Sequence, residues 1–184
     1  ELHGAHGYLI HEFISPISNQ RKDEFGGSLD NRLKFPLEIF DEVRSVVPSE
    51  TALGLRLTGT DWHYDGLSIE DARNVAKSFE THGADYLCIS SGGITTGLKI
   101  PVGPNYQVHL AKAVKSVVSI PVRAVGLITT AEQANDIILN GEADMVALAR
   151  AFLANPRWGW DASITLQQPI KVPPQYERSY RLLQ

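Results

Sequence analysis

The chain has 184 residues, of which 43% are hydrophobic and 21% are charged, a composition typical of one globular domain with a single core. A net charge of -4 with scattered basic residues argues against nucleic acid or a membrane surface as the main partner. The single cysteine, Cys88, excludes an internal disulfide and fits either a reducing compartment or simply a small buried apolar residue, and we expect a cytoplasmic protein. No apolar run reaches the roughly 20 residues of a membrane span.

The first eight residues carry the densest chemistry of the chain. His3, His6 and Tyr8 lie within six positions, and Gly4 and Gly7 interrupt any regular element, which predicts a strand that gives way to a loop. Two imidazoles can hold one carbonyl or nitro oxygen, and a phenol can deliver a proton beside it. An ordinary hydrogen-bonded loop explains the spacing equally well. We expect no metal, because His-x-x-His supplies only two ligands.

The first half of the chain predicts a loop, two helices and two strands. Residues 11–27 are turn-rich and form a long loop. A helix with an apolar stripe follows from Ser28 as N-cap to about residue 47. Residues 53–57 form a buried strand. A capping box at Ser68 to Asp71 then begins a helix that Gly83 ends, and residues 86–89 form the next strand.

The second half repeats this pattern. A helix is predicted from about 108 to 118 and a strand from 120 to 125. The segment Thr129-Thr-Ala-Glu132 predicts a second capping box, which begins a helix that finishes at Gly141. The last strand covers residues 144–148, and a short helix from Arg150 to Ala154 follows it directly.

Apolar strands that alternate with amphipathic helices indicate an α/β fold with a parallel sheet covered by helices. The end of one strand and four complete strands match the C-terminal half of a (β/α)8 TIM barrel, from the end of strand 4 through strand 8. An open doubly wound sheet is the alternative, but no Gly-x-Gly-x-x-Gly follows any strand. We expect a single domain over residues 1–184, with a C-terminal tail from about 166 to 184.

Two arginines fall at or near the carboxyl ends of predicted strands, where a barrel gathers its functional groups. Arg56 interrupts a buried strand, and a buried guanidinium costs several kcal/mol unless an anion pairs with it. The alternative for Arg56 is an internal salt bridge to a carboxylate. Arg150 begins the short last helix, where barrels commonly bind phosphate, but an ordinary surface arginine is an equal alternative.

Taken together, several motifs resemble the old yellow enzyme family of NADH:flavin oxidoreductases, the FMN-dependent ene-reductases. The match runs nearly from end to end, and its most specific part leads through Gly26-Gly27 to Asn31-Arg32. The matching motifs are His3-Gly-Ala-His6-Gly-Tyr8, Asn19 to Arg32, Leu55-Arg-Leu57, Val125-Gly-Leu-Ile128 and Ala147-Leu-Ala-Arg150.

The resemblance implies an enzyme that reduces the activated C=C bond of an α,β-unsaturated carbonyl compound. In such an enzyme His3 and His6 hold the electron-withdrawing oxygen of the substrate, and Tyr8 protonates the carbon next to it. Hydride passes from NAD(P)H to the flavin and from the flavin to the β-carbon.

The resemblance also assigns residues to the FMN. Arg56 lies at the pyrimidine edge of the flavin, where its charge favours the reduced ring. The phosphate is bound by Gly126, Ala149 and Arg150. The family usually has glycine where Ala149 stands, and this departure affects how closely the backbone approaches the phosphate.

Two features resemble a bacterial, thermophile-like branch of the family. His6 stands where other members carry asparagine, and the tail contains Gln175-Tyr-Glu-Arg178. The resemblance implies that Arg178 reaches into the substrate pocket of a neighbouring subunit, so we expect a homo-oligomer.

The resemblance implies that only the C-terminal half of the barrel is present in these residues. We expect the partner of this chain to be the N-terminal half-barrel or another copy, and we expect the 184 residues alone to be inactive. Two other readings stay open: a phosphate-binding TIM-barrel lyase or isomerase without flavin, in which His3 and Tyr8 act as acid and base, and a non-catalytic half-barrel.

Overall fold

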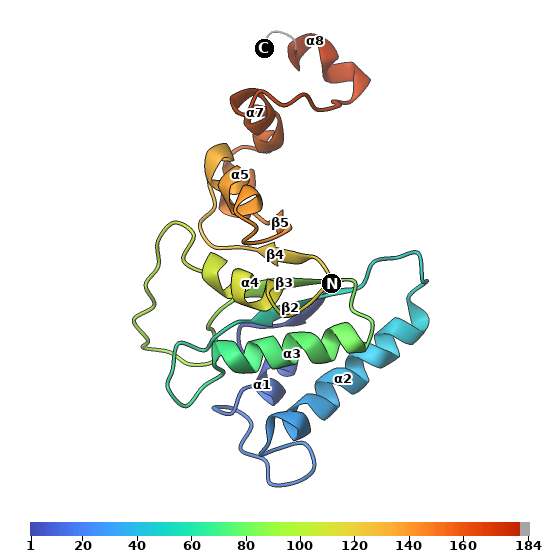
Figure 1. The fold of residues 1–184 in the computed structure, drawn as a ribbon, viewed down its shortest axis with the longest axis vertical. Coiled ribbons are helices and arrows are strands. Elements are labelled where there is room, and N and C mark those ends of the chain that lie inside the picture. The colour runs from blue at the N-terminus through green and yellow to red at the C-terminus, as the bar shows by residue number, and fades with distance from the viewer. Residues whose placement is uncertain (181–184) are drawn as a thin grey trace.

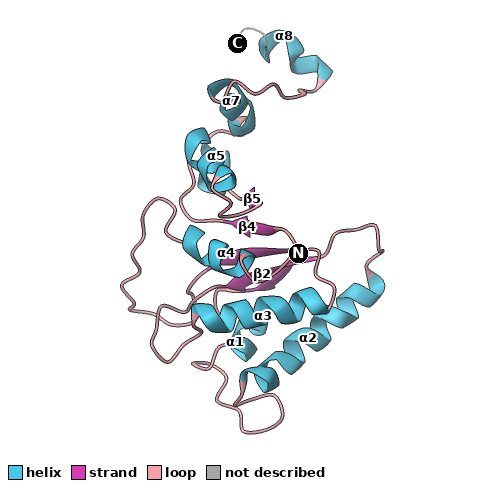
Figure 2. Ribbon diagram, viewed as in Figure 1, coloured by secondary structure: helices cyan, strands magenta, loops and turns pink. Residues whose placement is uncertain are grey.

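The computed structural model describes residues 1–180, and its centre is one parallel sheet (Figures 1 and 2). The strands pair in chain order, each with the one before it. They are β1 (Leu2–Gly4), β2 (Gly54–Thr58), β3 (Tyr86–Ser90), β4 (Val122–Ala124) and β5 (Met145–Val146). The expected parallel sheet with helices between its strands is therefore confirmed. Its place as the C-terminal half of a barrel stays a prediction.

Helices α1, α3, α4 and α5 contact the strands, all from one face of the sheet, whereas α7 and α8 extend away from it (Figure 2). Within residues 1–180 none of them is long and apolar enough to cross a membrane. Their bounds are α1 (Leu9–Ile14), α2 (Leu29–Val46), α3 (Ile69–Thr81), α4 (Val108–Lys115), α5 (Ala131–Leu139), α6 (Arg150–Ala154), α7 (Trp158–Thr165) and α8 (Glu177–Tyr180), with a 3-10 turn η1 (Pro174–Tyr176) before α8.

Alternation along the strands separates an apolar face from a polar face. On the face covered by helices the core holds Leu55, Leu57, Leu87, Ile89, Val122 and Ala124, all at most 2% exposed. The register aligns Arg56 with Cys88 and Cys88 with Arg123, so these three side chains share the opposite face. In a barrel this second face is the interior. The sheet therefore directs Arg56 and Arg123 to the face away from the helices.

The helix caps explain where two of the predicted helices begin. Ser28 accepts a hydrogen bond from the amide of Asn31, and Ser68 and Asp71 form the predicted reciprocal capping box. The box predicted at Thr129 and Glu132 is wrong by one residue. Thr130 is the N-cap, and Gln133 supplies the returning bond, because the apolar stripe of α5 begins at Ala131.

Three segments differ from the predicted elements. Helix α1 covers residues 9–14 and so overlaps the start of the predicted loop. This short helix buries Ile10 and Ile14 on one side. Strand β5 has only two residues, since it has no neighbour on its outer side. The tail contains η1 and α8 where no helical period was found, and residues 181–184 of the predicted tail lie outside the described residues.

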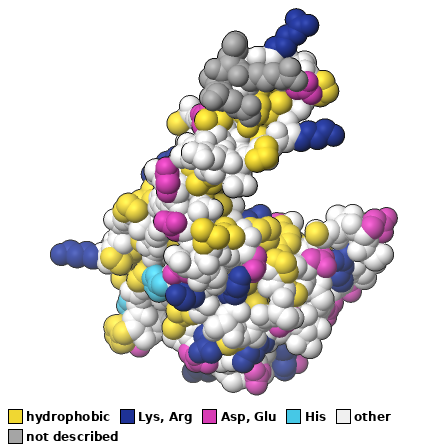
Figure 3. Space-filling model, turned by 45° about the horizontal axis from the view of Figure 1, so that its top comes forward, with side chains coloured by type: hydrophobic (Ala, Val, Ile, Leu, Met, Phe, Trp, Pro, Cys, Tyr) yellow, Lys and Arg dark blue, Asp and Glu magenta, His cyan; other side chains and the backbone are white. Residues whose placement is uncertain are grey.

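The surface agrees with the modest net charge of the chain. On the face shown in Figure 3, positive and negative side chains are interspersed and no continuous patch of one sign is seen. This face therefore offers no concentrated positive charge for a polyanionic partner.

Candidate active site

His3, His6 and Tyr8 form one cluster at the carboxyl end of β1. The ring centroids of His3 and His6 are 5.3 Å apart, and those of His3 and Tyr8 are 5.0 Å apart. His3 belongs to the strand, His6 lies in the loop after it, and Tyr8 is the N-cap residue of α1 with 62% of its surface exposed. The three polar groups predicted from the sequence are therefore together and open to a ligand.

The loop that carries the cluster has a fixed and unusual backbone. His6 and Gly7 both have left-handed φ angles, of 58° and 77°. The loop after β3 packs directly on it, because a Cβ added to Gly93 would lie 2.5 Å from Cα of His6. In addition, the amide of His6 donates to Oγ1 of Thr58 at 3.2 Å. Contacts from two neighbouring strands thus set the direction of the His6 side chain.

A fully buried polar pair lies beneath this loop. The amide of Gly7 donates to Nδ1 of His11 at 2.9 Å, and Nε2 of His11 lies 3.0 Å from Oδ1 of Asp61. The other oxygen of Asp61 accepts from Oγ of Ser15 and from the amide of Leu67, each at 2.7 Å. Burial raises the pKa of Asp61, but these donors outweigh it, so the pKa is lowered and the carboxylate is charged.

Burial and a nearby positive charge keep the two histidines of the cluster neutral at pH 7. Burial, followed by the positive charge of Arg56, lowers the pKa of His6 to about 4. The same two causes, in the same order, lower the pKa of His3. A neutral imidazole offers one N–H donor and one acceptor nitrogen. The cluster is therefore suited to donate hydrogen bonds to a neutral substrate oxygen rather than to bind a fixed anion.

Arg56 lies next to His3 in the sheet and also lines a second site. Its Nε donates to Oγ of Ser90 at 3.2 Å, across the β2–β3 pairing. No carboxylate within residues 1–180 forms an ion pair with Arg56, so the alternative of an internal salt bridge is wrong for the described part of the chain. Its charge is free to interact with a ligand.

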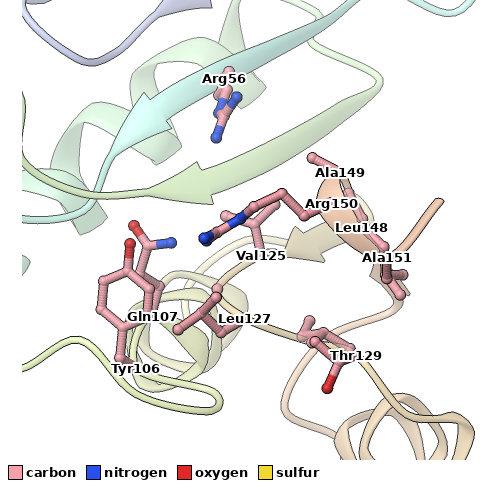
Figure 4. A pocket seen from close by; sticks show the side chains of 13 residues that line it. Arg56, Tyr106, Gln107, Val125, Leu127, Thr129, Leu148, Ala149, Arg150 and Ala151 are labelled. Atoms are coloured by element: carbon pink, nitrogen blue, oxygen red, sulfur yellow. The ribbon is translucent and has the colours of Figure 1, made fainter. Parts of the chain in front are cut away.

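The second site is a pocket at the carboxyl ends of β2, β4 and β5 (Figure 4). It holds about 790 Å³, including its open mouth. All four residues expected to bind the cofactor line it: Arg56, Gly126, Ala149 and Arg150. Its wall contains no aspartate or glutamate. The pocket and the histidine cluster share only Arg56, so the predicted site residues form two adjoining groups.

Gly126 and α6 shape the floor of this pocket. Gly126 has a φ of 130°, and a Cβ there would lie 3.1 Å from the backbone nitrogen of Gln107. Ala149 is the N-cap of α6 without a side-chain cap, and Arg150 is the first exposed residue of this helix. A glycine is needed at position 126 because Gln107 packs closely against it and because its φ is one that other residues rarely adopt.

These features fit an anionic cofactor such as FMN. Arg56 and Arg150 have no acidic partner among residues 1–180, and the pocket between them offers donors and no negative side chain. A phosphate balances such charges and accepts from several donors at once. Within the same range no three His, Cys, Asp or Glu side chains are grouped to hold a metal ion.

Some site residues escaped the sequence analysis. Ser91 and Gln107 hydrogen-bond beside the pocket, and His11 and Asp61 support the loop of the cluster. The only sequence signal for Gln107 is a polar residue just before the apolar stripe of α4. Arg178, by contrast, lies on α8 at the far end of the chain from the sheet, so the described chain does not bring it to its own cluster (Figure 1).

Comparison with known families points in the same direction as this geometry. The model of the NADH:flavin oxidoreductase / NADH oxidase family matches residues 1–168. The chain is 45% identical over 181 residues to an NADPH dehydrogenase of Geobacillus sp. (strain WCH70) and 44% identical to one of Geobacillus thermodenitrificans (strain NG80-2). Both alignments cover 98% of this chain and 52% of the relative. The chain thus spans about half the length of these relatives.

Solved structures of flavoenzymes share the fold. One of them, a complex of 2-naphthoyl-CoA reductase with 2-naphthoyl-CoA, superposes with a TM-score of 0.78 at 27% sequence identity. The alignment covers 91% of this chain and 26% of that one. The structural neighbours are TIM-barrel flavoenzymes, and the parallel sheet of this chain corresponds to part of such a barrel.

Proposed function

The chain belongs to the NADH:flavin oxidoreductase / NADH oxidase family, and from this membership and the two adjoining sites we propose that it forms the C-terminal half-barrel of an FMN-dependent ene-reductase. The family implies FMN as cofactor and NAD(P)H as electron donor. The proposed substrates are α,β-unsaturated carbonyl compounds. One observation carries the proposal: His3, His6 and Tyr8 meet beside Arg56, which also lines the cofactor pocket.

His3 and His6 hold the carbonyl oxygen of the substrate. Both are neutral at pH 7 because their pKa values are lowered, so each donates one N–H without bringing a net charge. Two donors on one oxygen draw electron density from the conjugated C=C bond and stabilise the negative charge that develops on that oxygen. The β-carbon thereby becomes a better hydride acceptor.

Tyr8 supplies the proton that completes the reduction. Its ring lies 5.0 Å from that of His3, and its exposed position leaves the phenol free to reach the substrate. As hydride arrives at the β-carbon, the Tyr8 hydroxyl transfers its proton to the α-carbon, and solvent then restores the phenol. One hydride and one proton are added across the double bond.

Arg56, Gly126, Ala149 and Arg150 hold the cofactor, which when bound accepts hydride from NAD(P)H and delivers it to the substrate. Arg56 would place its positive charge beside the ring system, and Arg150 would bind the phosphate. Gly126 and Ala149 offer backbone at the pocket floor. Ala149 replaces the glycine usual in the family, and its φ of -105° is negative, so the position does not require glycine for a left-handed backbone.

Two further parts of the proposal concern assembly. The free outer edges of β1 and β5 suit pairing with the N-terminal half of the barrel. Arg178 lies exposed on α8, away from the sheet, where it can enter the substrate pocket of a neighbouring subunit in a homo-oligomer.

The change Tyr8→Phe tests this function in the intact protein. We expect enone reduction to slow by roughly 10²-fold or more, while flavin reduction by NAD(P)H stays within about twofold of wild type. Stopped-flow absorbance of the flavin separates these two half-reactions. Tyr64→Phe is the matched control, because Tyr64 is 91% exposed and outside the cluster. Equal slowing of both half-reactions would contradict the role of Tyr8.

A further inference from the structure

Gln107 is a buried side chain on the wall of the cofactor pocket whose amide nitrogen has no partner. Its side chain is part of the pocket lining, and the residue is only 5% exposed. It is the N-cap residue of α4, but its side chain makes no capping bond. No hydrogen bond involves Nε2 of Gln107 within the part of the chain that the structure describes. Nε2 itself is not fully enclosed, so an acceptor in the pocket can reach this unpaired donor.

Ser91 fixes the orientation of this amide. The hydroxyl of Ser91 donates to Oε1 of Gln107 at 2.7 Å in a buried contact. Because the oxygen of the amide is engaged by Ser91, its NH2 group is the end left for the pocket. The loop before Gln107 is also pinned, since the amide of Asn105 donates to the carbonyl oxygen of Gly126 at 2.9 Å.

Nε2 of Gln107 lies where an anion is expected. A Cβ added to Gly126 would lie 3.2 Å from this nitrogen, so the amide stands directly beside the glycine of the pocket floor. Figure 4 shows the amide nitrogen and the guanidinium group of Arg150 turned toward one another, with Arg56 pointing into the same space. Three groups that only donate hydrogen bonds thus converge where no acidic side chain is present.

We propose that Gln107, held by Ser91, donates a hydrogen bond from Nε2 to the phosphate of the bound flavin mononucleotide. This inference rests on the proposed function for the identity of the ligand. The recognised group is a phosphomonoester dianion, whose three terminal oxygens accept from Arg150, from the backbone and from Gln107. Ser91 is a positioning residue, because it acts on the ligand only through the amide of Gln107.

The test compares two flavins that differ only in the phosphate. The apo form of the intact protein is titrated with FMN and with riboflavin, and binding is followed by flavin fluorescence. Gln107→Leu should weaken FMN binding by about tenfold to a hundredfold and change riboflavin binding by less than about threefold. Gln107→Glu keeps the bond from Ser91 but places a carboxylate at the phosphate, so it should weaken FMN binding further. Ser91→Ala should give a smaller, equally FMN-specific loss.

Gln168→Leu is the matched control, because Gln168 is exposed and outside this pocket. Thermal unfolding of each apo variant shows whether it is folded, and Gln107→Glu serves if the leucine variant is not. Equal weakening of both flavins, or no weakening of FMN, would overturn the inference. If the wild-type protein binds neither flavin, the proposed function is wrong. Titration with inorganic phosphate then tests the inference about Gln107 by itself. Phosphate binding that Gln107→Leu weakens supports the inference, and its absence overturns it.

Discussion

The amide of Gly7 donates to Nδ1 of His11, and this bond dictates which nitrogen of His11 carries the proton. Since Nδ1 must accept, it is unprotonated, and the proton resides on Nε2, which faces Asp61 at 3.0 Å. Neither of these two facing atoms has another hydrogen-bond partner in residues 1–180. The direction of the bonds that link Asp61, through His11, to the loop of His6 and Gly7 is therefore set.

This direction predicts a large effect of Asp61→Asn. An asparagine has one acceptor oxygen, whereas Asp61 must accept on both sides, from His11 and from Ser15 and Leu67. One buried contact is lost whichever way the amide turns, so we expect a loss of about 2 to 4 kcal/mol in the free energy of unfolding. Urea denaturation measures this value. The exposed Asp65→Asn is the control, and a change in Asp61→Asn below about 0.5 kcal/mol would contradict the analysis.

A methyl group at Gly93 should disturb specifically the loop that carries His6. The added Cβ would lie 2.5 Å from Cα of His6, and Gly93 has a φ of 93° that alanine tolerates poorly. Gly97→Ala is the matched control, since Gly97 has a similar φ of 78° with no atom within 4 Å of the added group. We expect Gly93→Ala to lose at least tenfold in kcat/KM for an enone and Gly97→Ala to lose less than twofold. Equal losses would show that backbone strain alone is responsible.

The lowered pKa of His6 predicts that stability depends on pH. In the unfolded chain a histidine takes up its proton near pH 6.5, but His6 in the folded protein does so only at about 4. The unfolded state therefore binds more protons between these values, and the free energy of unfolding falls as the pH is lowered from 6.5 to 4. Since His6 is partly exposed, we expect a contribution of about 1 to 2 kcal/mol.

Denaturation by urea at pH 7.0, 5.5 and 4.5 measures this dependence, and His6→Asn is the informative variant. Asparagine keeps a hydrogen-bond donor but does not titrate, so the slope of stability against pH should decrease. Part of the slope should remain, because the pKa of His3 is lowered as well. An unchanged slope in His6→Asn would mean that His6 is not the group responsible.

Arg178 is predicted to act on a second subunit. It is exposed on α8, and no ion pair of Arg178 occurs within residues 1–180. We expect Arg178→Ala to raise KM for the enone by about tenfold with little change in kcat, while Lys171→Ala, an exposed change in the same tail, leaves both unaffected. Light scattering after gel filtration gives the oligomeric state. A monomeric intact protein, or an unchanged KM, would refute this role.

Periodicity and caps predicted most of the fold from the sequence. The stripes of α2 to α5 and the serines that cap two of them are local signals, so they can be read without knowing the neighbours. Helix α1 was missed because its six residues are too few to establish a period. The length of β5 was overestimated because it depends on a partner strand, which is not a property of the segment itself.

The candidate site was predictable where unusual residue types stood out. Two histidines and a tyrosine in one loop, and an arginine in an apolar strand, are conspicuous in the sequence. His11, Asp61, Ser91 and Gln107 are not, since each appears as an ordinary polar residue near a loop. Their roles come from pairings over 50 residues (His11 with Asp61) and 16 residues (Ser91 with Gln107), which only the folded chain reveals.

The strict chain order of the strands also determines how the sheet is assembled during synthesis. Each strand of the series β1-β2-β3-β4-β5 docks on the strand made just before it, so no segment leaving the ribosome must wait for a later one. The sheet grows by adding one βα unit at a time, and the connections between neighbouring strands are 20 to 49 residues long. Nascent chains of increasing length should therefore become resistant to protease one unit after another.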